Sequence, residues 1–377
     1  MDENKPVSWI APEGQRRAKS AVAVAMSFII LLSGLAFVSW KGYDAYMDWM
    51  QQEDYIGTGD EEVDIIISDG QGWGNVADTL MSVDAIKDPA LFEKEALKIT
   101  DGPQAGTWKV KTHIPARLAA EMLTTPANRV YVKFTVREGL RVTEVYPLLI
   151  EQFGITQEEI DTEMALILED PSLIGVTLPI NGSLEGVLFP DTYHLNPPQE
   201  TENPKAIFKR MAIEFNKVLE SLQFAAKAEA LGYSPYQALI VASIIEKEVN
   251  KDEYRGMVAQ AIYNRLETDI TGHRLEIDTS VNYGLNRTGY ANLDEYALKT
   301  DTPYNTYIHQ GLPPTPISLP GRASLEAAVN PTPGTQAFWV AVDLLTGETK
   351  FADTYNEHLK NVAQYQAWCR ANPEACK

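Results

Sequence analysis

Cysteine, histidine and basic side chains are scarce in this sequence, and each shortage excludes a class of function. The two cysteines, Cys369 and Cys376, do not have the C-x-x-C spacing of a cytosolic redox pair. The five histidines are scattered without metal-ligand spacing, so we expect no metal and no organic cofactor. Lysine and arginine number 32 against 52 aspartates and glutamates, and the resulting net charge of -20 argues against a nucleic-acid partner.

One uncharged run, residues 20–40, predicts a membrane segment. At about 1.5 Å per residue, a helix over this run would span about 30 Å, the thickness of a bilayer core. Basic residues precede the run and a mainly acidic stretch follows it, so we expect the N-terminus in the cytoplasm and everything after Trp40 outside. A cleaved signal peptide is the alternative, although its apolar region would be shorter.

This reading predicts a single-pass protein of the cytoplasmic membrane. Its cytoplasmic tail would be residues 1–19, its transmembrane helix 20–40 and its linker 41–62. With the C-terminus outside the cell, Cys369 and Cys376 could close a small disulfide loop in the tail 369–377.

An internal echo follows the linker. Residues 63–80 align without gaps on residues 132–149, with Asp69-Gly70 opposite Glu138-Gly139. Each copy reads as a β-rich run, an acidic-glycine turn and the start of an amphipathic helix. We therefore predict a small α+β module over residues 63–150, either a LysM-like carbohydrate-binding unit or a spacer for the rest of the chain.

The segment from Ser234 to Val249 carries the clearest chemical signal. Ser234 and Gln237 form a capping-box pattern, and the residues from Ala238 to Ile245 are apolar or small on every side, which predicts a buried helix. Two carboxylates, Glu246 and Glu248, follow at its end. A carboxyl group in low dielectric has a raised pKa, as a general acid near neutral pH requires. The alternative is that both glutamates are simply solvated.

The remaining pattern completes an α+β fold class. Residues 151–368 read as a mixed helical catalytic domain, with helices expected near residues 205–231 and 254–267. A hairpin around the turn at Thr346-Gly347 predicts a short β-rich part near its C-terminal end.

Six segments, in this order, resemble the endolytic murein transglycosylases of the MltG/YceG-like family. They are LEGVLFPDTYHL (184–195), ASIIEKE (242–248), AIYNRL (261–266), LEIDTSVNYGL (275–285), DTPYNTYIHQGLPPTPISLPG (301–321) and AAVNP (327–331). The chain departs from the family pattern in these motifs: Glu276 and Thr279 stand where a glutamine and a proline are common, and Thr315 stands where a glycine is common.

The resemblance implies that Glu246 is the catalytic residue, whereas helical spacing alone gives only a mild preference for it over Glu248. A lytic transglycosylase needs one acid, because the C6 hydroxyl of the substrate's muramic acid attacks the anomeric carbon and leaves a 1,6-anhydro ring. Glu246 would protonate the departing oxygen and then take the proton of the attacking hydroxyl. For Glu248 we expect an ion pair, with Arg265 on the next helix as its partner.

Other motif residues are predicted to line the sugar groove: Glu185, Tyr193, Asn264, Asp278, Tyr304 and Asn305. Asp278 is also the candidate for a second catalytic carboxylate. If it activated water, the protein would be a muramidase-type hydrolase; a non-catalytic, membrane-anchored peptidoglycan-binding protein is the other alternative. The resemblance implies a role in limiting the length of nascent glycan strands, with penicillin-binding proteins as possible partners.

Overall fold

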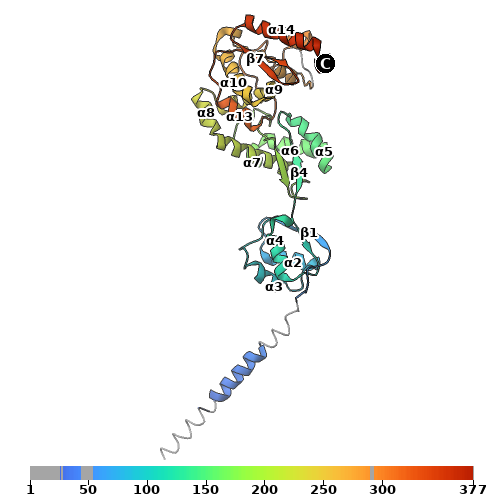
Figure 1. Ribbon diagram of the computed structural model, residues 1–377. Helices are drawn as coiled ribbons and strands as arrows, with labels where there is room; N and C mark the ends of the chain where they lie inside the picture. Colours follow the sequence, from blue (N-terminus) through green and yellow to red (C-terminus); the bar gives the residue numbers. More distant parts are fainter. Residues whose placement is uncertain (1–25, 27–28, 44–53, 289–292, 377) are drawn as a thin grey trace, which may run out of the picture. The chain divides into compact units, whose positions relative to one another are not determined.

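The computed structural model describes residues 26, 29–43, 54–288 and 293–376 (Figure 1). It divides the chain into two compact units, residues 1–129 and 130–377. The module predicted over residues 63–150 crosses the boundary between the two units, because the second copy of the internal echo, residues 132–149, lies in the second unit. The α+β fold class is confirmed, because both units combine helices with small sheets.

The transmembrane helix predicted over residues 20–40 is wrong. Within the described residues, no helix is both long and apolar enough to cross a membrane. The helical residues described in this region are Met26 and residues 29–43. Residues 20–25, 27 and 28 of the predicted span lie outside the described residues.

The first unit is built on a small antiparallel sheet. Strands β1 (Glu62–Ile67) and β2 (Gly106–Lys111) pair from Glu62 opposite Lys111 to Ile67 opposite Gly106. The sheet order is β1-β2-β3, and β3 (Arg129–Val130) lies where the unit ends. Three helices complete the unit: α2 (Trp73–Ser82), α3 (Pro89–Ala96) and α4 (Ala116–Thr124). Their apolar faces and the inner face of the sheet share one core, which includes Trp73, Phe92 and Trp108.

The second unit begins with β4 (Val132–Thr135), which pairs antiparallel with β5 (Thr192–Leu195). Helices α5 (Val142–Phe153), α6 (Gln157–Glu169), α7 (Pro204–Leu222) and α8 (Phe224–Ala230) follow in chain order around this pair. The long helix predicted over residues 205–231 is divided at Gln223, which has the left-handed backbone conformation. Both copies of the echo fold as predicted, since Gly70 and Gly139 turn with positive φ between a strand and a helix.

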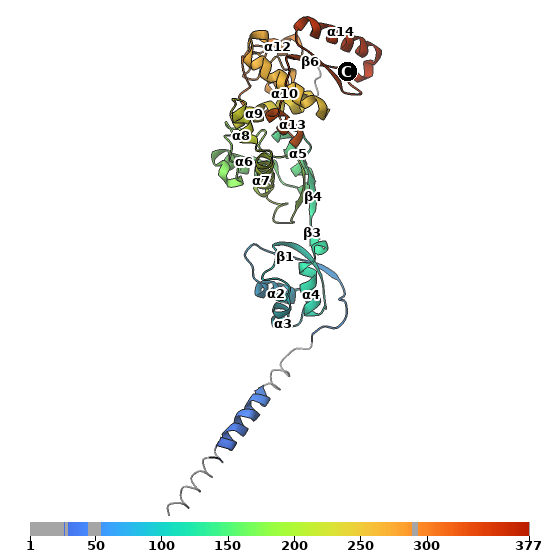
Figure 2. The same cartoon turned by 60° about the vertical axis from the view of Figure 1, so that its left-hand side comes forward.

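Helix α9 (Pro235–Glu248) forms the centre of the second unit. Ser234 and Gln237 make the predicted capping box, and every residue from Ala238 to Ile245 is buried. The helix packs against α10 (Asp252–Glu267), α11 (Asp278–Gly284) and α13 (Arg322–Val329). Figure 2 shows α9, α10 and α13 together in this unit. The last turn of this buried helix, which carries Glu246 and Glu248, is therefore surrounded by other elements of the second unit.

The C-terminal part closes on a hairpin. After α12 (Glu295–Lys299), strands β6 (Phe338–Asp343) and β7 (Glu348–Ala352) pair antiparallel, as the turn at Thr346-Gly347 predicted. Helix α14 (Tyr355–Ala371) packs on this hairpin. A disulfide joins Cys369 to Cys376, so the small loop considered in the sequence analysis does form.

Candidate active site

Glu246 lies on the last turn of α9, where donors from three residues, two at the start of α13 and one on α10, converge on its carboxyl group. Its Oε2 atom accepts hydrogen bonds from the backbone N–H of Gly321 at 3.0 Å and from Ser324 Oγ at 2.7 Å. Arg255 Nη1 on α10 lies 3.3 Å from the same oxygen. The Glu246 side chain is only 7% exposed. Such donors stabilise a carboxylate in a site that excludes most water.

The other oxygen of Glu246 has different surroundings. No residue that the structure describes donates a hydrogen bond to Oε1. Oε1 is not a fully buried oxygen, so it reaches the molecular surface. One oxygen of the carboxyl is therefore held in place, and the other is left open to a ligand.

The donors are themselves held in position. Gly321 and Ser324 are the N-cap and the third residue of α13, so the positive end of that helix faces Glu246. Arg255 also donates to Ser324 Oγ and, from Nε at 2.9 Å, to Asp252. These bonds orient the guanidinium and the hydroxyl before any ligand arrives.

The loop that ends at Gly321 runs along α9. Ile317 N donates to Ser243 Oγ at 3.0 Å, and Ser318 Oγ donates to the carbonyl of Ser243 at 2.9 Å. Ser243 is fully buried, so the polar atom in this apolar helix serves to dock the loop. The motif GLPPTPISLPG thus places the start of α13 beside Glu246.

The turn at Glu138-Gly139 also reaches this site. Gly139 N donates to the carbonyl of Leu319, and Leu319 N donates to the carbonyl of Leu140, at 2.9 and 2.8 Å. Lys247 Nζ donates to the carbonyl of Gly139 at 3.0 Å. A Cβ atom built on Gly321 would lie 1.9 Å from Glu138 Oε1, so the Glu138 carboxyl rests directly against this glycine.

Burial raises the pKa of Glu138, and repulsion from Glu246 raises it further, although Arg255 partly offsets both effects. Sequence reasoning recorded Glu138 only as part of a turn and did not single out Arg255, Ser324 or Gly321 as site residues. The signal that could have identified Glu138 is its position in the echo, because the second copy places an acidic residue at a tight turn just before a helix.

Glu248 has a different environment from Glu246. Its Oε1 accepts from Thr279 Oγ1 at 2.6 Å, and its Oε2 accepts from Trp339 Nε1 at 3.1 Å. Burial raises the pKa of Glu248. Arg265, the partner expected for it, instead donates to the carbonyls of Ala337 at 2.6 Å and of Leu275.

The structure also places the six residues predicted to line the sugar groove. Glu185 is buried and accepts from Val142 N and Tyr283 OH, both at 3.1 Å. Burial raises its pKa to about 7, against the lowering effect of these hydrogen bonds. Tyr193 donates to the carbonyl of Phe189 at 2.5 Å.

Asn264 and Asn305 are hydrogen-bonded to backbone. Asn264 donates to the carbonyls of Gly334 and Gln336, while Asn305, which is fully buried, donates to the carbonyls of residues 297, 298 and 300. The structure does not bring either side chain into contact with Glu246, and their predicted role in substrate binding stays a prediction.

Asp278 and Tyr304 belong to the motifs at residues 275–285 and 301–321. Asp278 accepts from Tyr307 OH at 2.6 Å, and burial raises its pKa. Tyr304 OH lies 2.8 Å from Thr315 Oγ1. Among the described residues, no hydrogen bond or ion pair joins Asp278 to Glu246, whereas Asp252 is bonded to Arg255 and Glu138 lies against Gly321.

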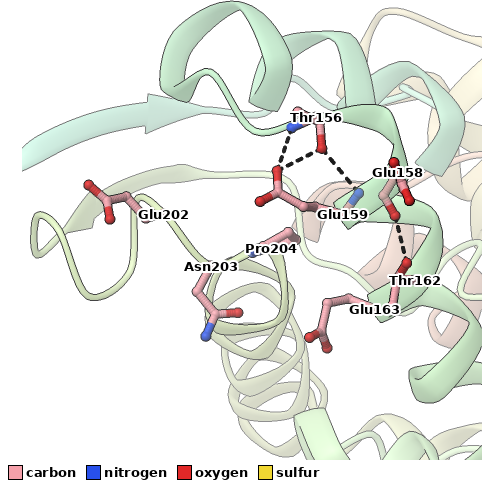
Figure 3. Close-up of a pocket in the computed structure, with 8 residues that line it drawn as sticks. All are labelled: Thr156, Glu158, Glu159, Thr162, Glu163, Glu202, Asn203 and Pro204. Carbon is pink, nitrogen blue, oxygen red and sulfur yellow. Dashed lines mark hydrogen bonds between the residues drawn. The ribbon is translucent and has the colours of Figure 1, made fainter.

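Two cavities lie away from this cluster. One, of about 570 Å³, is bordered by the first turns of α6 and α7, including Glu158, Glu159 and Glu163 (Figure 3). The other, of about 340 Å³, lies at the start of α9 beside Tyr233 and Tyr236. Within the described part of the chain, no group of three or more histidine, cysteine, aspartate or glutamate side chains is arranged to hold a metal ion.

The sequence of this chain is similar to a known protein family and to named bacterial proteins. The family model described as "YceG-like family" matches residues 65–364. A Bacillus subtilis (strain 168) protein named endolytic murein transglycosylase is 28% identical over 314 residues, which are 80% of this chain and 84% of that protein. A protein of the same name from Streptococcus pneumoniae serotype 2 is 25% identical over 370 residues, 91% of this chain, and the match spans 65% of the pneumococcal protein.

A solved structure gives the same likeness at the level of fold. The crystal structure of a putative yceG-like protein, lmo1499, from Listeria monocytogenes matches with a TM-score of 0.53 and 24% identity. The match covers 80% of this chain and 99% of the Listeria chain.

Proposed function

Because this chain belongs to the YceG-like family, we propose that it is an endolytic murein transglycosylase whose acid is Glu246. The family resemblance predicted from the six motifs is confirmed, and the predicted activity agrees with the name that the relatives carry. The observation that carries the proposal is the carboxyl of Glu246, which has one oxygen fixed by three donors and the other open at the surface.

This arrangement suits proton donation to a glycosidic oxygen. The proton would sit on Oε1 and pass to the oxygen that leaves the anomeric carbon of the muramic acid. As the proton leaves, negative charge develops on the carboxyl, and the donors of Gly321, Ser324 and Arg255 already point at Oε2 to stabilise it. The donors need no rearrangement during the reaction.

The nucleophile in this mechanism belongs to the substrate. The C6 hydroxyl oxygen of the muramic acid attacks the anomeric carbon, so a bond forms within one sugar as the glycosidic bond breaks. An internal nucleophile has a high effective concentration, and the glycan end that results is a 1,6-anhydro sugar. Water is not consumed.

The test is the chemical nature of the glycan ends. Isolated sacculi are incubated with the purified full-length protein, and the fragments are analysed by mass spectrometry. We expect 1,6-anhydro ends generated at internal positions of the strands. Reducing ends would instead identify a muramidase-type hydrolase, and binding without cleavage would identify a non-catalytic wall-binding protein.

The proposal extends to the compartment and the role. Peptidoglycan lies outside the cytoplasm, and a disulfide such as Cys369–Cys376 persists in an oxidising space, so we place the catalytic unit outside the cytoplasm. There an endo-acting enzyme would limit the length of nascent strands beside penicillin-binding proteins. Crosslinking in cells followed by identification of the captured proteins tests this partnership.

A further inference from the structure

Glu138 is an exposed residue whose carboxyl group lies at the Glu246 site, and the mechanism above does not use it. Glu138 makes no hydrogen bond or ion pair with any residue that the structure describes, although it lies against Gly321, whose N–H holds Glu246. An exposed carboxylate without a protein partner, in contact with the residue that fixes the acid, is available to a ligand bound there.

Hydrogen bonds hold the backbone of the turn that carries Glu138. Two hydrogen bonds join the 139–140 segment to Leu319, and Lys247 fixes the carbonyl of Gly139. The absence of a side chain at Gly321 leaves the space for this approach, because a Cβ atom there would overlap Glu138 Oε1 and the Glu138 side chain would have to move. The position of Glu138 is therefore built by the same segments that build the surroundings of Glu246.

Placing Glu138 here is electrostatically unfavourable. Burial raises the pKa of Glu138 and repulsion from Glu246 raises it further, so a glutamate that was only a surface residue would be expected to turn away from the second carboxylate. Natural sequences retain such local conflicts mainly at functional sites. The alternative is that Glu138 is a solvated surface residue without a function. That alternative explains the exposure of Glu138 but not the space that Gly321 leaves for its carboxyl group.

We propose that Glu138 is the catalytic base of the reaction and acts on the C6 hydroxyl of the muramic acid. This inference rests on the proposed function and divides its two proton transfers between two residues. Glu138 takes the proton of the C6 hydroxyl as that oxygen bonds to the anomeric carbon. Glu246 gives its proton to the departing oxygen as the glycosidic bond breaks.

The step balances without a further reagent. One C–O bond forms, one C–O bond breaks, and one proton moves at each end. Glu138 finishes protonated and Glu246 finishes ionised. Both carboxyl groups reach solvent, so exchange with water restores the starting protonation states. A raised pKa suits a base that must both accept and return a proton near neutral pH.

The experiment compares Glu138→Gln with the wild-type full-length protein on sacculi, following anhydro ends over time across a series of pH values. We expect kcat to fall about 10²-fold or more with little change in KM, because general base catalysis contributes on that scale. In the wild type, kcat should decline as the pH is lowered through the pKa of Glu138, and Glu138→Gln should lack that decline. Glu138→Asp, which keeps a base, should recover part of the rate.

The matched control is Glu151→Gln, an exposed glutamate on α5 in the same unit, which should keep the wild-type rate and pH profile. Thermal unfolding of each variant checks that the fold is intact. If Glu138→Gln keeps the wild-type kcat and pH profile, the base assignment is wrong while the transglycosylase proposal stands. If the wild type itself yields no anhydro ends, the proposed function fails, whatever Glu138→Gln does.

Discussion

The surroundings of Glu246 and of Glu248 differ although both residues lie on the last turn of α9. At Glu248, one donor engages each oxygen, and the group is enclosed between Thr279 and Trp339. At Glu246, three donors engage one oxygen and leave the other at the surface. The buried Glu185 follows the Glu248 pattern, with one donor on each oxygen. The comparison teaches that a carboxyl with both oxygens satisfied is suited to stabilising the fold, whereas one left open is suited to chemistry.

The largest expected effect is on activity at Glu246. Glu246→Gln removes the transferable proton but keeps the shape of the side chain, so the rate of anhydro-end formation should fall at least about 10³-fold. Arg255 keeps Asp252 as a partner, so the variant should remain folded. Product analysis by mass spectrometry gives the rate, and circular dichroism checks the fold. Activity close to the wild type would remove Glu246 from the mechanism.

Glu248 should show the opposite behaviour. Glu248→Ala leaves Thr279 and Trp339 without their acceptor and creates a cavity, so the free energy of unfolding should decrease by about 3 to 5 kcal/mol. Because burial raises the pKa of Glu248, the neutral Glu248→Gln should cost clearly less. Denaturant unfolding measures both variants. A loss of turnover in Glu248→Gln with unchanged stability would contradict the contrast between the two glutamates.

Glu185 should make the stability depend on pH. Its pKa is raised from 4.5 to about 7 in the fold, so the folded state binds the proton more tightly than the unfolded chain does. The stability from this group is complete below about pH 4.5 and is lost as the pH rises to about 7, a loss of at most about 3 kcal/mol. Unfolding curves at several pH values should therefore show a steeper decline for the wild type than for Glu185→Gln. Equal slopes would show that Glu185 does not titrate in this way.

The smallest expected effect concerns one donor to Glu246. Ser324→Ala removes a single hydrogen bond to Oε2 and leaves those from Gly321 and Arg255, so kcat should fall about 10-fold. Ser172→Ala, at an exposed serine, is the control and should leave kcat unchanged. An undiminished kcat in Ser324→Ala would show that Oε2 needs no such support.

Local patterns predicted the parts of the fold that depend on neighbouring residues. The capping box at Ser234, the apolar run from Ala238 to Ile245 and the hairpin at Thr346-Gly347 all formed as expected. The predicted transmembrane helix was wrong, because no helix among the described residues is long and apolar enough to cross a membrane. The break at Gln223 was not foreseen, since one residue with a left-handed backbone leaves no trace in hydrophobic periodicity.

The site was harder to predict than the fold. The motif resemblance singled out Glu246, but Gly321 and Ser324 lie 75 and 78 positions away along the chain. Their approach depends on the docking of a whole loop on Ser243, which no local pattern encodes. Several motif residues chosen for their sugar-binding chemistry, such as Asn305, have their hydrogen bonds taken up by the backbone. A motif identifies residues that matter without saying whether they serve the fold or the substrate.

Digestion of sacculi in water enriched in heavy oxygen tests the central claim most directly. If Glu246 donates its proton through an open oxygen while the substrate supplies the nucleophile, the new glycan ends are 1,6-anhydro sugars and carry no heavy oxygen. Incorporation of one heavy oxygen atom at each new end would show that water is the nucleophile and would contradict the account.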